Sequence, residues 1–212
     1  MSTFLHVGNP AGYHPFAPRA AAVTRLLAEL GHAVENELVE GYEADFPFYN
    51  TERLGKLRGV VVSTTLGRFT ADQIEALVQF VRGGGALIGI HSATDTAHDC
   101  DRYMNLIGGR FRTHPQQLDV TVQLSDPAHP ITKGVAPFTL HEELYVMWYD
   151  PTHVHELLHT TSHLGARLPV AWTREEGRGR VFYISLGHRE DVYENPHFLR
   201  LLKQGIGWAA GG

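Results

Sequence analysis

Histidine is the residue type whose abundance in this chain points to chemistry. The sequence has 14 histidines among 212 residues but a single cysteine, Cys100. Imidazole titrates near neutral pH and is a common metal ligand, so histidines can serve acid–base or metal chemistry. A lone thiol can form neither an internal disulfide nor a thiolate metal cluster. Most single histidines are nevertheless surface or capping residues, so their positions along the chain must decide which ones serve chemistry.

One pair of histidines has the spacing of a zinc protease. Residues 155–159 read His-Glu-Leu-Leu-His, but this pattern binds zinc only on a helix, where residues four apart share a face. On a strand the two histidines would lie about 13 Å apart. An Asp-Pro pair at 150–151 and Thr-Thr-Ser at 160–162 favour an extended segment, and the metzincin continuation is missing. We predict that this is not a protease site and leave the role of residues 153–163 open.

The elements that would position the other histidines alternate between strands and helices. Residues 59–64 and 86–90 are apolar or β-branched runs, typical of strands buried on both faces of a parallel sheet. Between them, Thr70 and Gln73 form a capping-box pair that begins a helix, and Gly83 ends it. This alternation predicts an α/β fold with a doubly wound, mostly parallel sheet.

The remaining elements complete a single predicted domain over residues 1–212. In the first half we expect strands at 5–7 and 33–39, with a helix at 17–30. The second half has strand-like segments at 119–124, 143–148, 169–173 and 180–186 with little helix between them, so some antiparallel strands are expected there. A final helix covers about 196–209, and neither a repeat nor a linker divides the chain.

Three histidines come directly after predicted strands. His14 follows the first strand, His91 follows the strand at 86–90, and His188 follows the strand at 180–186. In open α/β sheets, ligands bind beyond the carboxyl ends of the strands. The three imidazoles can therefore converge on one cleft.

A series of collinear motifs resembles the ThuA-like (trehalose utilisation) family over nearly the whole chain. The motifs are GGGALIGIHSATD at 83–95, Tyr103, GGRF at 108–111, HP at 114–115, DPAHP at 126–130, ELY at 143–145, PVAW at 169–172, GRGRVF at 177–182, LGH at 186–188 and GIGWA at 205–209. In the unusual segment 9–19, His14 matches the family's early histidine. The family has Asp-Glu before Leu-Tyr, whereas this chain has Glu142 and Glu143, so Glu143 matches and the role of Glu142 stays open.

The resemblance implies a flavodoxin-like fold similar to class I glutamine amidotransferases. In those enzymes a strand-to-helix elbow presents a nucleophilic cysteine, and a later strand ends in its histidine partner. Here His91 stands at the elbow position and His188 at the end of the later strand. Imidazole cannot form the thioester with glutamine, so we predict no amidotransferase activity. Cys100, nine positions further on, is interpreted as a buried or neutral residue.

Seven residues are assigned to the predicted site, partly by strand ends and partly by the resemblance. The candidates for catalysis are His91, Glu143 and His188, with His91 or Glu143 as the base and His188 as the acid or electrophile. The candidates for substrate binding are His14, His114, Tyr145 and Trp172, whose aromatic members suit the C–H faces of a sugar. The resemblance alone brings His114 and Glu143 to this cleft.

Three functions fit these residues. The family is associated with trehalose and related disaccharides through 3-keto-sugar intermediates, which implies an enzyme that acts on a keto-sugar or related glycoside as an isomerase or lyase. The first alternative is a metal-dependent hydrolase in which His91, Glu143 and His188 hold a zinc ion with one position open for water. The second alternative is a non-catalytic sugar-binding or regulatory protein.

The composition excludes some classes of partner. The net charge is −5, and the 18 basic residues form no run, so neither nucleic acid nor an acidic membrane is expected to bind. No apolar run approaches the roughly 18 residues of a membrane helix, and the N-terminus does not resemble a signal peptide. We expect a cytoplasmic protein with a small-molecule sugar as its partner, and leave open whether it forms a homodimer.

Overall fold

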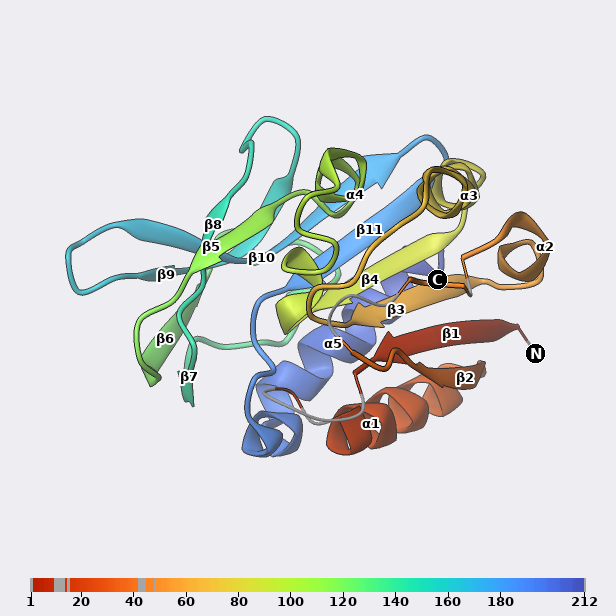
Figure 1. Cartoon of the computed structure of the whole chain (residues 1–212). Coiled ribbons are helices and arrows are strands. Elements are labelled where there is room, and N and C mark those ends of the chain that lie inside the picture. The colour runs from red at the N-terminus through yellow and green to blue at the C-terminus, as the bar shows by residue number, and fades with distance from the viewer. Residues whose placement is uncertain (1, 10–13, 15, 42–44, 48, 212) are drawn as a thin grey trace.

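The parallel half of the sheet contains the strands predicted in the first half of the chain. The computed structural model describes residues 2–9, 14, 16–41, 45–47 and 49–211. Among these residues, nine strands form one sheet in the order β2-β1-β3-β4-β11-β10-β9-β6-β7 (Figure 1). The parallel strands are β2 (Ala33–Leu38), β1 (Thr3–Gly8), β3 (Gly59–Ser63), β4 (Ala86–Ile90) and β11 (Gly179–Ile184).

The antiparallel half begins at β11 and extends the same sheet. It consists of β10 (Arg167–Glu176), β9 (His155–Thr161), β6 (Leu118–Leu124) and β7 (Phe138–Glu142). Strands β5 (Arg110–Thr113) and β8 (Val146–Trp148) form a separate two-stranded ribbon. The prediction of a mostly parallel α/β sheet with antiparallel strands in the C-terminal half is confirmed. The strand predicted at 143–148 is confirmed only for its last three residues, because the chain leaves β7 after Glu142 and enters β8 only at Val146.

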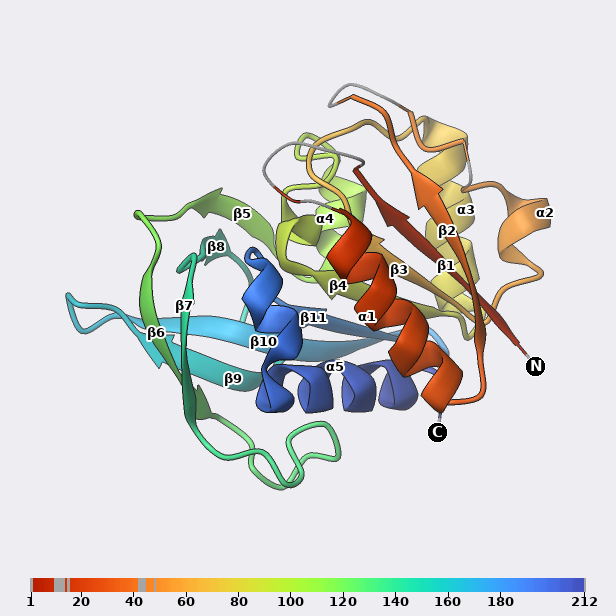
Figure 2. The ribbon, with the colours of Figure 1, turned by 90° about the horizontal axis from the view of Figure 1, so that it is seen from below.

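Helices cover both faces of the sheet. Helices α1 (Phe16–Glu29) and α5 (Pro196–Ala209) lie on one face, which Figure 2 shows from below. On the other face are α3 (Ala71–Arg82) and α4 (Asp101–Ile107), with the short α2 (Thr51–Leu54) nearby (Figure 1). Each face of the sheet has its own hydrophobic core, and alternate residues of β3 point into one or the other. Val61 packs with α1 and α5, whereas its neighbours Val60 and Val62 pack with α3 and α4. Within the described chain, no helix has the length and apolar character needed to cross a membrane.

Local signals explain where the helices begin. Thr70 and Gln73 form both hydrogen bonds of the capping box predicted for α3. The Asn195 side chain accepts hydrogen bonds from the first turn of α5, and Pro196 occupies its first position. Two short 3₁₀ turns, η1 (His91–Thr94) and η2 (Glu190–Glu194), follow β4 and β11 at the edge where the parallel strands end.

Candidate metal centre

The turn that follows β4 presents His91 to several other elements. His91 has a φ of +49°, a left-handed conformation that is uncommon outside glycine, and it begins η1. The strand-to-helix turn expected at this residue is therefore present. The ring is fully buried, and its Nε2 lies 3.3 Å from Oε2 of Glu143 in the break between β7 and β8.

Four side chains converge at this point, and we call them the His/Glu cluster: His14, His91, Glu143 and His188. Their potential ligand atoms all lie within 4.8 Å of one another. The Nε2 atoms of His14 and His91 are 3.1 Å apart, and the rings of His91 and His188 have centroids 5.3 Å apart. The structure thus brings together the three residues predicted for catalysis and adds His14, which the sequence assigned to substrate binding.

Hydrogen bonds indicate which ring nitrogens carry lone pairs. Nδ1 of His91 lies 2.7 Å from the carbonyl oxygen of Ser185, which can only accept, so the neutral ring is assigned its lone pair on Nε2. Nδ1 of His14 lies 2.8 Å from Oγ1 of Thr65, a hydroxyl that can accept its proton. In that tautomer the lone pair of His14 also lies on Nε2 and faces that of His91, an arrangement that a cation between them would stabilise. Metal-ligating histidines commonly donate their second N–H to a carbonyl or similar group in this way.

His188 supplies an independent sign that the cluster suits an ion. Its Nδ1 is buried and, among the described residues, has no hydrogen-bond partner. Oε1 of Glu143 is 3.2 Å from this nitrogen, which is close enough for an ion pair, but the two atoms lack hydrogen-bond geometry. Buried polar atoms in folded proteins are normally paired, so this orphaned nitrogen fits a ligand that the protein itself does not provide.

The electrostatics give His14, His91 and Glu143 the protonation states of metal ligands. Burial, with the nearby charges of His91 and Arg19, lowers the pKa of His14 to about 2. Burial also lowers the pKa of His91, against the opposing effect of Glu143. Burial alone would raise the pKa of the Glu143 carboxyl, but its contacts with His188 and His91 hold that pKa well below its usual range. Neutral imidazoles and an ionised carboxylate are the forms that bind a cation.

A pocket of about 470 Å³ opens beside the cluster, and we call it the site pocket. It is lined by His14, Thr65, Leu66, Asp95, Phe111, His114, Glu143 and Tyr145. The Tyr145 hydroxyl lies 3.0 Å from Nε2 of His91, and burial raises the pKa of this phenol well above its ordinary value, so it keeps its proton. His114 Nε2 is 3.6 Å from Oε1 of Glu143. A small molecule in this pocket would contact both the cluster and two aromatic rings.

Comparison with known families identifies the relationship that these motifs indicated. The model of the ThuA family, described as trehalose utilisation, matches residues 5–209. The chain belongs to the ThuA family. A comparison with curated protein sequences finds no match.

Solved structures with low sequence identity share the ThuA fold. A ThuA-like protein from Parabacteroides merdae is 17% identical, with a TM-score of 0.83 over 99% of this chain and 90% of its own. One from Bacteroides uniformis is 20% identical, with a TM-score of 0.77 over 98% and 91% of the two chains. A carbohydrate deacetylase, Agd3, is 15% identical with a TM-score of 0.67, and the match covers all of this chain but 33% of that one. At these identities the likeness establishes the fold alone.

Trp172 does not line the site pocket of this ThuA protein. The side chain is fully buried, its Nε1 donates to the carbonyl oxygen of Ile107 at 2.9 Å, and its ring packs 4.4 Å from that of Tyr183. A large ring whose only donor is satisfied by the backbone is a core residue. The prediction that Trp172 forms an aromatic wall against the sugar is therefore wrong, and Phe111 lies beside Tyr145 in the pocket instead.

The zinc-protease spacing lies on a strand, as predicted. His155 and His159 both belong to β9, between β10 and β6. His155 is exposed and its Nε2 lies 2.8 Å from Asp126, whereas Nδ1 of His159 lies 2.8 Å from Ser125. Among the described residues, neither histidine belongs to a group that could hold a metal ion.

Sequence reasoning missed two fully buried charged residues that hold the site. Glu142 accepts a hydrogen bond from the Glu143 amide at 2.8 Å and from the amides of Gly187 and His188 at 2.9 and 3.0 Å. Arg19 donates to the carbonyl oxygen of Gly187 at 2.9 Å. A signal for Glu142 exists, because it continues the inward alternation of β7 two residues after Leu140. We find no comparable signal for Arg19.

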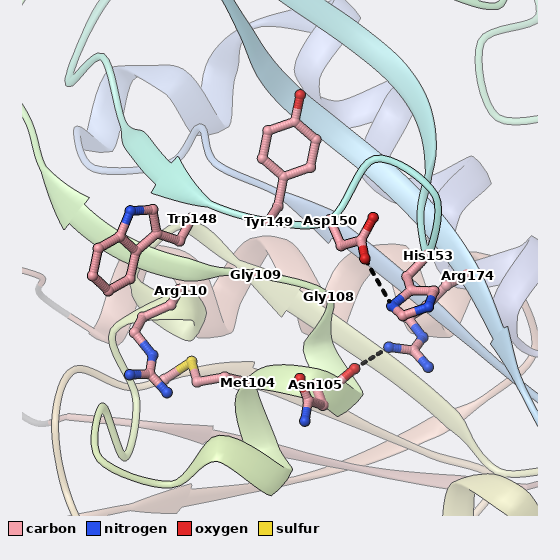
Figure 3. Close-up of a pocket in the computed structure, with 10 residues that line it drawn as sticks. All are labelled: Met104, Asn105, Gly108, Gly109, Arg110, Trp148, Tyr149, Asp150, His153 and Arg174. Atoms are coloured by element: carbon pink, nitrogen blue, oxygen red, sulfur yellow. Dashed lines mark hydrogen bonds and ion pairs between the residues drawn. The ribbon is translucent and has the colours of Figure 1, made fainter.

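A second pocket, of about 390 Å³, contains none of the predicted site residues (Figure 3). Arg110 lines it from β5, whereas the next residue, Phe111, lines the site pocket. Several of its polar groups already have partners: Asp150 lies 3.4 Å from His153, and Arg174 donates to the Asn105 carbonyl. These pairings leave the His/Glu cluster as the stronger candidate for chemistry.

Proposed function

We propose that this ThuA protein is a metal-dependent enzyme that transfers protons next to the carbonyl group of a keto-sugar derived from trehalose or a related disaccharide. The observation that carries the proposal is the convergence of three imidazoles and one carboxylate within 4.8 Å beside a pocket of about 470 Å³. The family's description as trehalose utilisation supports a sugar as the substrate.

The donor set favours a divalent transition metal such as zinc. Imidazole nitrogen suits Zn, Fe and Ni better than Mg or Ca, which prefer oxygen ligands. His14, His91, His188 and Glu143 would hold the ion, with the facing Nε2 atoms and the orphaned Nδ1 of His188 as natural ligand atoms. Such an ion acts as a Lewis acid that polarises a carbonyl oxygen.

The protonation states favour this metal proposal over catalysis by the same side chains as free acids and bases. A base with a strongly lowered pKa accepts protons weakly at neutral pH, and both His91 and Glu143 are of this kind. Their part is to bind and orient the ion. The protonated Tyr145 hydroxyl, 3.0 Å from His91, is placed to donate a hydrogen bond at the edge of the pocket. We further propose a cytoplasmic location, where a free thiol such as Cys100 stays reduced.

The proposal is tested in two steps. The protein is stripped with a chelator and titrated with Zn²⁺, Mn²⁺, Fe²⁺ and Ni²⁺ by calorimetry, and bound metal is counted by elemental analysis. Loaded and stripped protein are then incubated with 3-keto-trehalose in D₂O, and hydrogen exchange next to the carbonyl is followed by NMR. One ion per chain with metal-dependent exchange supports the proposal. Sugar binding without exchange in any metal form would instead favour a non-catalytic binding protein, and no metal binding would reject the metal centre.

A further inference from the structure

Asp95 is a carboxylate that the fold holds in the site pocket without giving it a structural task. It follows η1, and its side chain lines the pocket with His14, Glu143 and Tyr145. Among the described residues, none forms a hydrogen bond or ion pair with this carboxylate. We infer that Asp95 is the catalytic residue that removes a proton from the substrate and returns it, a role that rests on the proposed function.

The backbone around Asp95 is held firmly although its side chain is free. Its amide donates to the carbonyl oxygen of Ser92 at 2.8 Å, and its own carbonyl accepts from the amide of Leu66 at 3.1 Å. Leu66 in turn accepts from Ala97 at 3.0 Å. Leu66 and Ala97 have φ values of +58° and +46°, which are strained for residues with a Cβ. Strain of this kind persists where the surroundings fix a segment, and it clusters at functional sites.

The surroundings tune Asp95 for proton transfer near neutral pH. Burial raises the pKa of the Asp95 carboxyl to about 6, and the charge of His98 opposes this only in part. Tyr145 and Tyr183 also interact with its charge, while His14, His114 and Glu143 line the same pocket. A proton donor or acceptor works best when its pKa lies near the operating pH. In the described lining of the pocket, Asp95 is the carboxyl with that property, because Glu143 is held ionised.

The step balances without any further reagent. The Asp95 carboxylate takes the proton from the carbon next to the carbonyl, the C–H electron pair becomes a carbon–carbon double bond, and the carbonyl electron pair moves onto its oxygen. The resulting carboxylic acid exchanges its proton with solvent and then returns a solvent-derived hydrogen to the same carbon, which gives the measured hydrogen exchange. After a proton has moved between the two neighbouring oxygens, return to the former carbonyl carbon moves the carbonyl by one position. No oxidant or reductant is consumed.

The test compares Asp95→Asn and Asp95→Glu with the control Asp99→Asn. Asp99 is an exposed carboxylate four residues away, and it lines a neighbouring pocket instead of the site pocket. Hydrogen exchange of 3-keto-trehalose in D₂O is measured for zinc-loaded protein, and zinc affinity is measured separately. We expect Asp95→Asn to lower the exchange rate by about 100-fold or more, with zinc affinity within about twofold of the wild type, and Asp95→Glu to recover part of the rate.

The outcomes separate this role from the proposed function. Exchange in Asp95→Asn close to that of a functioning wild type, or a matching loss in Asp99→Asn, overturns the role and leaves the metal-dependent function intact. Loss of zinc binding in Asp95→Asn would show that Asp95 supports the metal centre, which also overturns it. If wild-type protein binds zinc but exchanges no hydrogen, both proposals fail. Carbon-13 NMR of the stripped protein adds a readout that needs no substrate: an Asp95 carboxyl titrating at its ordinary value near 3.8 contradicts the role.

Discussion

Replacing Glu142 with glutamine tests how the candidate site is held. The carboxylate is fully buried, and its two oxygens accept hydrogen bonds from three backbone amides, those of Glu143, Gly187 and His188. A glutamine of the same shape offers one acceptor oxygen and one NH₂ group. The favoured orientation keeps the oxygen against Gly187 and His188, which leaves the NH₂ group facing the Glu143 amide, donor against donor.

The size of the effect follows from these bonds. Hydrogen bonds to a charged group contribute about 1.5–3 kcal/mol each, and a buried donor left unpaired costs about 1–3 kcal/mol. Losing one bond and weakening two others should lower the free energy of unfolding by roughly 3 kcal/mol. For a chain of this length each kcal/mol shifts the melting temperature by about 2–4 °C, so we expect a fall of about 6–12 °C. Because Glu143 loses its backbone support and that of His188 is weakened, zinc affinity should fall by about 10–100-fold.

The assay is thermal unfolding of the stripped protein, followed by zinc titration. The control is Glu175→Gln, which changes a glutamate of β10 whose side chain is 73% exposed. It should change the melting temperature by no more than the measurement error. A Glu142→Gln protein that melts within about 2 °C of the wild type and keeps its zinc affinity would refute the reasoning, since the three hydrogen bonds would then contribute nothing.

Four further predictions address other residues. His14→Ala should reduce zinc affinity by more than the roughly 10–100-fold expected for a residue that only supports a ligand; an unchanged titration would remove His14 from the cluster. Replacing both His155 and His159 with glutamine should leave bound zinc and sugar turnover unchanged, whereas loss of the ion would restore the zinc-protease interpretation. Cys100→Ser should keep full sugar turnover, and neither this variant nor the wild type should release ammonia from glutamine. Burial lowers the pKa of His6 from 6.5 to about 3, so below 6.5 the unfolded chain binds a proton that the folded chain does not. This site therefore makes the free energy of unfolding fall as the pH drops from 6.5 towards 3, by up to about 1.4 kcal/mol per pH unit. When the free energy of unfolding is measured with urea at several pH values, that of His6→Gln should depend less steeply on pH than that of the wild type.

The strand-end histidines were predictable because the rule behind them needs only the order of strands along the chain. Parallel strands have their carboxyl ends at the same edge of a sheet, so two histidines that each follow a parallel strand lie at the same edge. His91 and His188 lie close together because β4 and β11 are adjacent parallel strands. The same rule brought His14 to this cleft, but the sequence assigned it to substrate binding and did not show that it lies close enough to be a metal ligand. That depends on its contacts with Thr65 and His91, which lie 51 and 77 residues away along the chain.

Both errors concern β-strands. The strand predicted at 143–148 leaves Glu142 outside it, whereas the unpredicted β7 (Phe138–Glu142) ends at this residue and points its side chain inward. Trp172 was misplaced because residues 169–173 of β10 are all buried, so alternation gave no indication of which face meets the pocket.

The turn before His188 shows why buried charge marks this region as functional. Arg19 donates to the Gly187 carbonyl, and Glu142 accepts from the Gly187 amide, so opposite charges hold the two sides of one glycine. Gly187 has a φ of +117°, and a Cβ there would lie 2.8 Å from the Tyr193 hydroxyl, so the turn requires glycine. Charged side chains are almost never fully buried without such partners, because desolvation is expensive. An apolar pair would close the same space at lower cost but would leave the His188 backbone free to move. The desolvation cost of these two buried charges is explained if the position of His188 matters for function. Glu142→Gln tests this, because it weakens the support of the His188 backbone and the zinc titration then measures the effect on the site.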